Sequence, residues 1–249
     1  MKMKLLAIAT ILTATFIFTT SAEPTSTTTD LSAEIIPVED DAVSSSEEEE
    51  VAELYWAFSE TNADMPTLAT FSDGIRGYEK LKEEGDVKKE ILTLIDFSLP
   101  STEKRLWVLD MKNNQVLFHT HVSHGRNTGG NMATKFSNQE GSFQSSLGFY
   151  VTAETYYGKN GLSLFLDGKE EGFNSNARSR YVVMHGADYA NPDFISVAGR
   201  LGRSLGCPAV PSAFAKDIIG TIKGQSVLFV YHSDEDYQNQ SKYLNTSSI

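Results

Sequence analysis

The single cysteine of this chain lies in a segment whose composition favours a reactive thiol. Before Cys207, residues 199–206 supply three glycines together with Arg200 and Arg203. Glycines leave backbone N–H groups free to hold an oxyanion, and arginines add a positive potential that favours the thiolate. A buried, inert cysteine would more often lie inside an apolar run. The segment therefore predicts that Cys207 is a nucleophile.

A thiol nucleophile needs a base at neutral pH, and His185 is the candidate. Residues 181–184 are typical of a β-strand that ends at His185 and Gly186, so we expect the imidazole where a rigid strand meets solvent. Taken singly, His185 is more typical of a half-buried ring bonded to a backbone carbonyl. The pairing with Cys207 changes this interpretation and predicts a thiol that is activated by an imidazole base.

Three further histidines suggest a different chemistry. His119 and His121 share one face of a predicted strand over residues 115–122, and His124 follows it. A three-imidazole zinc site is the alternative here, but the sequence places no Asp or Glu close by, so we predict a solvated strand face and no metal. His124 also opens the glycine-rich loop 125–130, where either a substrate contact or a structural role is expected.

The charge of the chain excludes one class of partner. The 249 residues carry 21 Lys and Arg against 33 Asp and Glu, a formal net charge of −12. Nucleic-acid binding needs a basic surplus on one surface, so no nucleic-acid partner is expected. Much of the acidity lies in residues 23–50, which hold no Lys or Arg. This segment has too few apolar residues to fold and predicts a disordered acidic linker.

The N-terminus has the pattern of a secretory signal. Lys2 and Lys4 precede an apolar run over residues 5–18, and the small residues Thr20 and Ala22 suit a cleavage site after Ala22. We therefore expect a signal peptide over residues 1–22. An uncleaved anchor is disfavoured because the run is shorter than the ~20 residues of a membrane span, so no membrane span is expected after cleavage.

The elements that must position Cys207 and His185 are mostly strands. Residues 51–86 have helical spacing and predict a small helical lead-in that ends at Gly85. Residues 87–232 predict one mainly β domain, with a helix over 211–222 and a disordered polar tail over 233–249. The predicted strands cover residues 91–97, 105–110, 115–122, 147–155, 162–166, 180–185 and 226–231. Residues 112–114 are typical of a hairpin turn, since Asn tolerates positive φ.

At these positions the chain resembles a known family. His185-Gly186, followed after a spacer by Ser204-Leu205-Gly206-Cys207, is similar to the signature of L,D-transpeptidases with the YkuD-type catalytic domain. Residues 97–231 look most like its branch of murein L,D-transpeptidase catalytic domains. The resemblance implies a β-sandwich-like domain, no cofactor, and a bacterial enzyme exported to the periplasm or cell wall.

The resemblance also implies roles for single residues. Cys207 would attack a peptidoglycan stem peptide and form a thioester, with His185 as its base and Gly186 behind the ring. Ser204 and Gly206 would shape the oxyanion pocket. An amine acceptor would give a 3-3 cross-link, whereas water would give a trimmed tripeptide, so an L,D-carboxypeptidase is the alternative. Arg200 and Arg203 are candidates for binding the stem carboxylates, with ordinary loop solvation as the alternative.

One residue departs from the signature. Leu205 replaces the histidine that precedes the glycine and cysteine, and this loss leaves a catalytically silent wall-binding relative as a second alternative. Ser123-His124-Gly125 has the missing tripeptide but no adjacent cysteine.

Overall fold

The computed structural model describes residues 40–60 and 64–245. The expected signal peptide and residues 23–39 of the expected linker lie outside these residues. Within them, eight strands form one mixed sheet in the order β3-β2-β1-β8-β4-β5-β6-β7. The predicted mainly β fold is confirmed. The strands are β1 (Ile91–Asp96), β2 (Leu106–Asp110), β3 (Gln115–Thr120), β4 (Gly148–Gly158), β5 (Gly161–Gly168), β6 (Val183–Ala187), β7 (Ala209–Pro211) and β8 (Val227–Tyr231).

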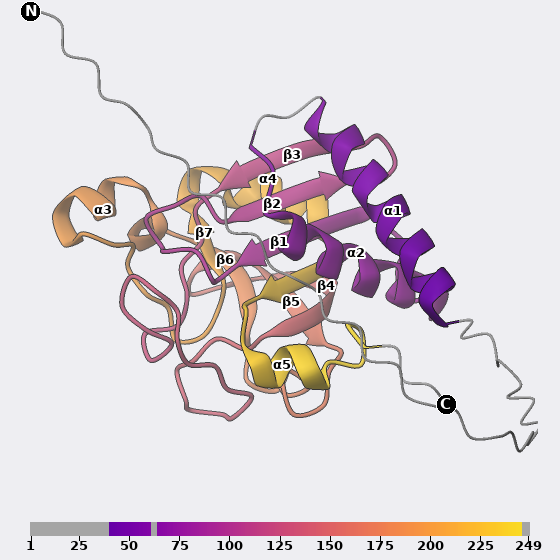
Figure 1. Ribbon diagram of the computed structural model, residues 1–249. Helices are drawn as coiled ribbons and strands as arrows, with labels where there is room; N and C mark the ends of the chain where they lie inside the picture. Colours follow the sequence, from indigo (N-terminus) through magenta and orange to yellow (C-terminus); the bar gives the residue numbers. More distant parts are fainter. Residues whose placement is uncertain (1–39, 61–63, 246–249) are drawn as a thin grey trace, which may run out of the picture. The chain divides into compact units, whose positions relative to one another are not determined.

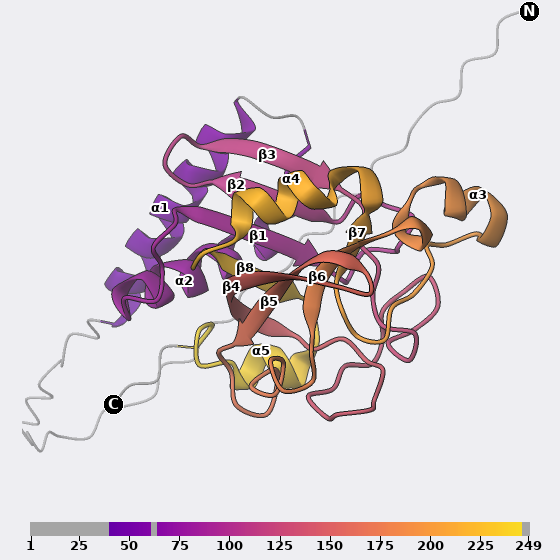
Figure 2. The ribbon, with the colours of Figure 1, turned by 180° about the vertical axis from the view of Figure 1, so that it is seen from behind.

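Two helical layers cover this sheet. Helix α2 (Leu68–Glu83) packs on β1 and β8, and α1 (Asp40–Ser59) packs on α2. Helix α4 (Ser212–Ile222) packs against β6 and lies on the opposite face, as the two views in Figures 1 and 2 show. The short helix α3 (Asp193–Ala198), which has no buried residue, follows the 3-10 turn η1 (Asp188–Ala190).

The middle of the sheet follows directly from the apolar sequence. Every residue of β1 and β8 is buried, as expected for strands covered on both faces. Strand β8 runs parallel to β1 and antiparallel to β4, so it joins the β1-β2-β3 part of the sheet to the β4-β5-β6-β7 part. Gly85 ends α2 with a φ of +79°, and Asn114 turns the β2–β3 hairpin with a φ of +52°, as expected.

The predicted tails differ from the structure at both ends. Helix α1 begins at Asp40, inside the predicted linker over residues 23–50, so the linker prediction is wrong from residue 40 onward. The predicted polar tail over residues 233–249 is also wrong up to Tyr243. Helix α5 (Glu235–Gln240) forms there, and Tyr237 and Tyr243 are buried.

A buried carboxylate explains why this polar C-terminal segment is ordered. Glu170 accepts hydrogen bonds from the Phe149 N–H at 2.7 Å, the Tyr237 hydroxyl at 3.0 Å and the Ser241 hydroxyl at 2.5 Å. Burial raises the pKa of Glu170, and these donors act in the opposite direction. The C-terminal segment therefore satisfies a polar group that would be costly to bury alone. None of the helices in residues 40–60 and 64–245 is long and apolar enough to cross a membrane.

Candidate active site

The loop before Cys207 is a tight turn closed by Ser204. The buried Ser204 hydroxyl donates to the Cys207 carbonyl at 2.6 Å and accepts from the Gly206 N–H at 3.0 Å. Gly206 has a φ of +127°, and a side chain there would approach the Gln144 carbonyl oxygen at 2.9 Å. Only glycine fits this position, and its N–H is already occupied by Ser204. Ser204 and Gly206, the two residues predicted to shape the oxyanion pocket, therefore determine the conformation of the loop before Cys207.

Residues 123–126 hold this loop from the other side. The Ser123 N–H donates to the Ala209 carbonyl at 2.8 Å, and the Arg126 N–H donates to the Ser204 carbonyl at 2.8 Å. The Ser204 N–H in turn donates to the His124 carbonyl at 2.9 Å. The loop before Cys207 is thus fixed by backbone hydrogen bonds from a segment far away in sequence.

Cys207 is partly exposed as a residue, but its sulfur is largely buried and lies between two backbone groups at the start of β6. Its sulfur accepts from the Val183 N–H at 3.5 Å and donates to the Tyr181 carbonyl at 3.5 Å. Burial raises the pKa of the Cys207 thiol, while the Val183 N–H and the charge of Arg180 act in the opposite direction. The net direction is upward, so the resting group is a neutral thiol that needs a base.

Arg180 is the cation that acts on this thiol, and the sequence analysis missed it. Its guanidinium donates to the carbonyls of Ser137 and Gln144 at 2.8 and 2.9 Å and to the Ser146 hydroxyl at 2.6 Å. These bonds hold the charge against the residue 137–146 loop, beside Gly206. The only signal in the sequence was a basic residue before the apolar run that leads to His185.

His185 lies on β6 opposite Ala209 of β7 and Ser163 of β5. Its side chain is buried, and Nδ1 donates to the Gly186 carbonyl at 2.9 Å. Burial lowers the pKa of His185, so the ring is neutral at pH 7 and Nε2 carries its free lone pair. Among the described residues, no hydrogen bond joins this ring to the Cys207 thiol. The two residues lie on neighbouring chain segments, because the His185 N–H donates to the Pro208 carbonyl at 3.4 Å and His185 pairs with Ala209.

Gly186 has a packing role on the opposite face of β6. A side chain at this position would lie 2.7 Å from the Cβ of Ala215 in α4. Helix α4 therefore approaches β6 closely at Gly186, and a role of Gly186 toward substrate stays a prediction.

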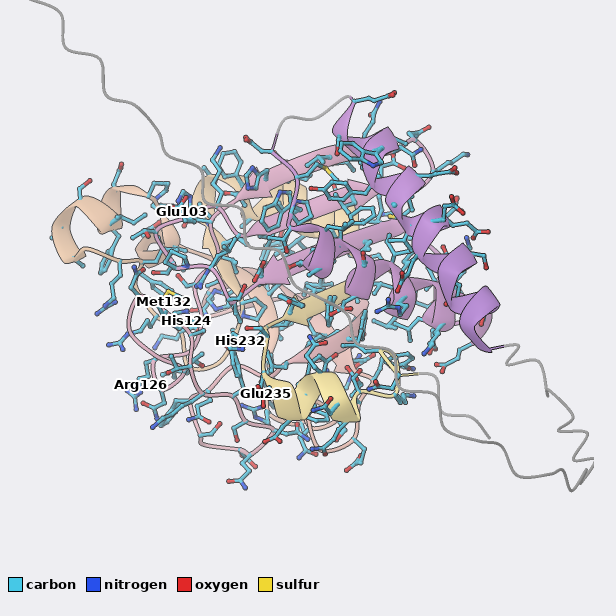
Figure 3. All side chains as sticks on the ribbon, viewed as in Figure 1. Glu103, His124, Arg126, Met132, His232 and Glu235 are labelled. Carbon is cyan, nitrogen blue, oxygen red and sulfur yellow. The ribbon has the colours of Figure 1, made fainter. Side chains whose placement is uncertain are left out.

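His124 is deeply buried and both of its ring nitrogens are occupied. Arg105, also buried, donates to Nδ1 at 2.8 Å, so Nε2 must carry the proton that it donates to the Gly130 carbonyl at 3.1 Å. Burial and the Arg105 charge lower the pKa of His124 to about 4. Figure 3 labels His124 on the ribbon. Both ring nitrogens of His124 are thus bonded to protein groups, which fits the structural role. The alternative, a contact with substrate, stays a prediction.

The two arginines of the loop face different surroundings. Arg203 is exposed and donates from Nη1 to the carbonyls of Arg126 and Gly129 at 3.1 and 2.9 Å. Arg200 donates to the Leu201 carbonyl at 2.7 Å. Leu205 is 60% exposed and contributes nothing to the core. Arg203 therefore braces the 125–130 loop, and its role toward stem carboxylates stays a prediction.

The two histidines of the predicted strand over residues 115–122 have local partners; His119 lies on β3 and His121 follows it. His119 stacks on Trp107 with ring centroids 4.7 Å apart, and its Nε2 bonds the Lys104 carbonyl at 3.1 Å. His121 bonds the Thr102 carbonyl at 3.2 Å. Within residues 40–60 and 64–245, no three His, Cys, Asp or Glu side chains gather in a group that fits a metal ion.

Fold and site together describe a mainly β domain with a thiol and a neutral imidazole on adjacent segments. In a comparison with protein families, residues 62–231 match the L,D-transpeptidase catalytic domain. The chain belongs to this family, whose members act on the peptidoglycan of the cell wall.

Solved structures give weaker likenesses. An L,D-transpeptidase from Mycobacterium smegmatis is 14% identical with a TM-score of 0.35, and an LD transpeptidase in complex with imipenem is 12% identical with a TM-score of 0.35. Each alignment covers 57% of this chain and 59% of that protein. An L,D-transpeptidase from Xylanimonas cellulosilytica is 11% identical with a TM-score of 0.32, covering 73% of this chain and 93% of that one. No curated protein matches the chain.

Proposed function

We propose that the protein is an exported cysteine acyltransferase that acts on peptidoglycan stem peptides as an L,D-transpeptidase. The observation that carries this proposal is the pairing of Cys207 with His185 in a chain of this family. Cys207 is partly exposed in a loop whose conformation is fixed, and the neutral imidazole of His185 lies on the neighbouring segment. The pattern of residues 1–22 supports export.

The first half-reaction forms a thioester. The Cys207 sulfur attacks the carbonyl carbon between the third and fourth residues of the stem, and its proton passes to His185 Nε2. This transfer requires the thiol to turn from the Tyr181 carbonyl toward the imidazole. The Cys207 N–H would donate to the developing oxyanion, since the Gly206 N–H is bonded to Ser204. When the intermediate collapses, His185 protonates the nitrogen of the departing D-alanine.

The second half-reaction releases the enzyme. An amine from a neighbouring stem attacks the thioester carbon, loses its proton to His185 and forms the 3-3 cross-link, while the thiol is regenerated. Water in the same place would give a tripeptide. The reaction needs a nucleophile, a proton shuttle and an N–H donor, all of which the chain's own residues supply.

Two measurements test this proposal. Wild type incubated with a carbapenem should gain the mass of the drug, and Cys207→Ala should not. An unshifted wild-type mass beside a labelled active transpeptidase would instead favour a silent wall-binding protein. Muropeptide analysis of treated sacculi then separates the reactions: 3-3 dimers indicate transfer, and tripeptides without dimers indicate a carboxypeptidase.

A further inference from the structure

The sheet face that carries His185 continues away from Cys207 as a row of aromatic rings. Phe165 lies opposite Val183, and Tyr156 lies opposite Ser163, which itself pairs with His185. Directly opposed residues of antiparallel strands share a face, so these side chains and His185 are on the same side of the sheet. Phe165 stacks on Tyr156 with centroids 4.8 Å apart and contacts Tyr181 at 6.1 Å. We call Tyr156, Phe165 and Tyr181 the aromatic row.

Tyr181 connects this row to the thiol and occupies a backbone position that favours glycine. Its carbonyl accepts from the Cys207 sulfur, and its φ is +52°. The Tyr181 N–H bonds the Arg178 carbonyl at 3.1 Å and the Val182 N–H bonds the Ala177 carbonyl at 2.9 Å, the pattern of a Schellman turn. A side chain in this conformation costs free energy that glycine would not, yet the ring is 67% exposed and gains little from burial. An exposed ring in a strained turn beside a reactive thiol points to a binding role.

Charged groups border the row and are already paired. Arg178 lies over the Phe165 ring, 5.0 Å from its centroid. It binds Glu154 through two hydrogen bonds of 2.8 and 3.1 Å, and binds Asp167 through two more, one of them 3.0 Å long. The Arg178 guanidinium thus has no pair of N–H groups available to bind a ligand carboxylate through two hydrogen bonds. The carboxylates of Glu154 and Asp167 remain hydrogen-bond acceptors, and hydrogen bonds from Arg178 hold the pKa of Glu154 down to about 2.

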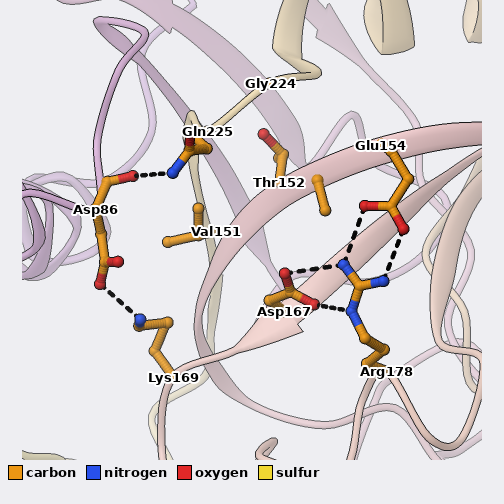
Figure 4. A pocket seen from close by; sticks show the side chains of 10 residues that line it. Asp86, Val151, Thr152, Glu154, Asp167, Lys169, Arg178, Gly224 and Gln225 are labelled. Atoms are coloured by element: carbon orange, nitrogen blue, oxygen red, sulfur yellow. Dashed lines mark hydrogen bonds and ion pairs between the residues drawn. The ribbon is translucent and has the colours of Figure 1, made fainter.

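A cavity of about 480 Å³ opens beside these groups (Figure 4). Its walls include Glu154, Asp167 and Arg178, and also Lys169, which forms an ion pair with Asp86 at 2.5 Å. Because both cations are neutralised by carboxylates, the cavity presents hydrogen-bond acceptors and attracts no anion. Its size suits a small-molecule ligand. A neutral ligand rich in O–H and N–H donors fits these walls better than an acidic stem peptide.

We infer that the cavity and the aromatic row bind the saccharide that carries the acyl-donor stem, an inference that rests on the proposed function. A pyranose ring has an apolar face of C–H groups that packs on aromatic rings, and its rim of hydroxyl and acetamido groups donates to carboxylates. N-acetylated sugars in the cavity would donate to Glu154 and Asp167, and the next ring along the strand would cover Phe165 and Tyr181. The stem attached there would reach Cys207 past the Tyr181 carbonyl.

Two acyl donors test this inference in the full chain: a free tetrapeptide stem and the same stem on its disaccharide. In wild type, kcat/KM should be higher for the disaccharide donor. Tyr156→Ala should lower this preference roughly threefold to tenfold through KM. Tyr157→Ala is the matched control, because Tyr157 is 82% exposed on the opposite face of β4. An equal loss for both donors would assign the row to the peptide and overturn the saccharide inference.

A second measurement does not depend on catalysis. Calorimetric titration with a tetramer of N-acetylglucosamine should give binding to wild type and to Cys207→Ala, and weaker binding to Tyr181→Gly. The Tyr181→Gly protein should also melt about 1–4 °C higher, because glycine relieves the turn. Carbapenem labelling without sugar binding would reject the inference alone, whereas sugar binding without labelling would reject the proposed function alone.

Discussion

The chain places two histidines beside glycines, and their surroundings are opposite. The ring of His124 has both nitrogens bonded to protein groups and is locked between Arg105 and a loop carbonyl. The ring of His185 has one nitrogen bonded to its own neighbour's carbonyl and one lone pair left for chemistry. In sequence, Ser123-His124-Gly125 matches the tripeptide that the signature lacks, whereas His185 was predicted as the base because of its pairing with Cys207.

This difference shows which property makes a histidine available as a base. Both rings are buried and both have lowered pKa values, so neither burial nor pKa separates them. The hydrogen bonds separate them. A neutral imidazole whose acceptor nitrogen already accepts from an arginine cannot take a proton from a substrate at that nitrogen. We expect each of the following experiments to sharpen or break this distinction.

The largest effect is expected from His185→Asn. Asparagine keeps an N–H close to the Gly186 carbonyl but has no basic nitrogen, so carbapenem acylation should slow by roughly 10²–10⁴ while the fold is retained. A time course of intact mass measures the rate. His124→Gln, with the same readout, should slow acylation by less than about tenfold. Comparable losses in the two variants would break the distinction.

The next effect concerns stability in acid. Because the His124 pKa is about 4 in the folded protein and about 6.5 when unfolded, the unfolded chain binds more protons between these values. The stability that neutral His124 provides is complete above pH ~6.5 and is lost as the pH falls, by about 2–3 kcal/mol at pH ~4.5. Urea unfolding of wild type and His124→Gln at the two pH values checks this. If the variant loses as much stability as wild type on acidification, His124 is not the group responsible.

A smaller effect is expected from the cation beside the thiol. Arg180→Gln removes the charge that lowers the Cys207 pKa, so alkylation by iodoacetamide near neutral pH should slow roughly threefold to tenfold. Arg180→Lys keeps the charge and should react at a rate close to wild type. If the lysine variant is as slow as the glutamine variant, the contribution of Arg180 lies in its hydrogen bonds to the 137–146 loop.

The smallest effect is expected from restoring the signature. Leu205→His places an imidazole at a position that is 60% exposed, away from the bonds that shape the loop. The free energy of unfolding should change by less than about 0.5 kcal/mol, and the acylation rate by less than about tenfold. A much faster enzyme would mean that His185 alone is an incomplete base.

Sequence patterns predicted the parts of the fold that local chemistry determines. The strands of the sheet centre are continuous apolar runs, and α4 has helical spacing with a clear buried face. Strand β7 has only three residues and was missed, because a run that short has no periodicity to detect. The ordered C-terminal segment was missed because its partner is the distant Glu170.

Of the candidate site, the sequence indicated only the two groups that we propose to react. Cys207 and His185 were identified from residue type and context, whereas Arg180 and Tyr181 depend on tertiary geometry. Residues 180–185 were predicted as one strand, but β6 begins at Val183 because Tyr181 adopts a left-handed turn. A propensity scale does not predict a tyrosine with positive φ, because tyrosine normally avoids this backbone conformation.

The position of β8 in the middle of the sheet has a consequence for how the protein is made. Residues 227–231 are synthesised after every other strand, yet they join the two parts of the sheet. Until they leave the ribosome, β1 and β4 both have open edges, and neither part can close its core. We therefore expect the sheet to close only after residue 231 has been made, so that folding is completed late in synthesis.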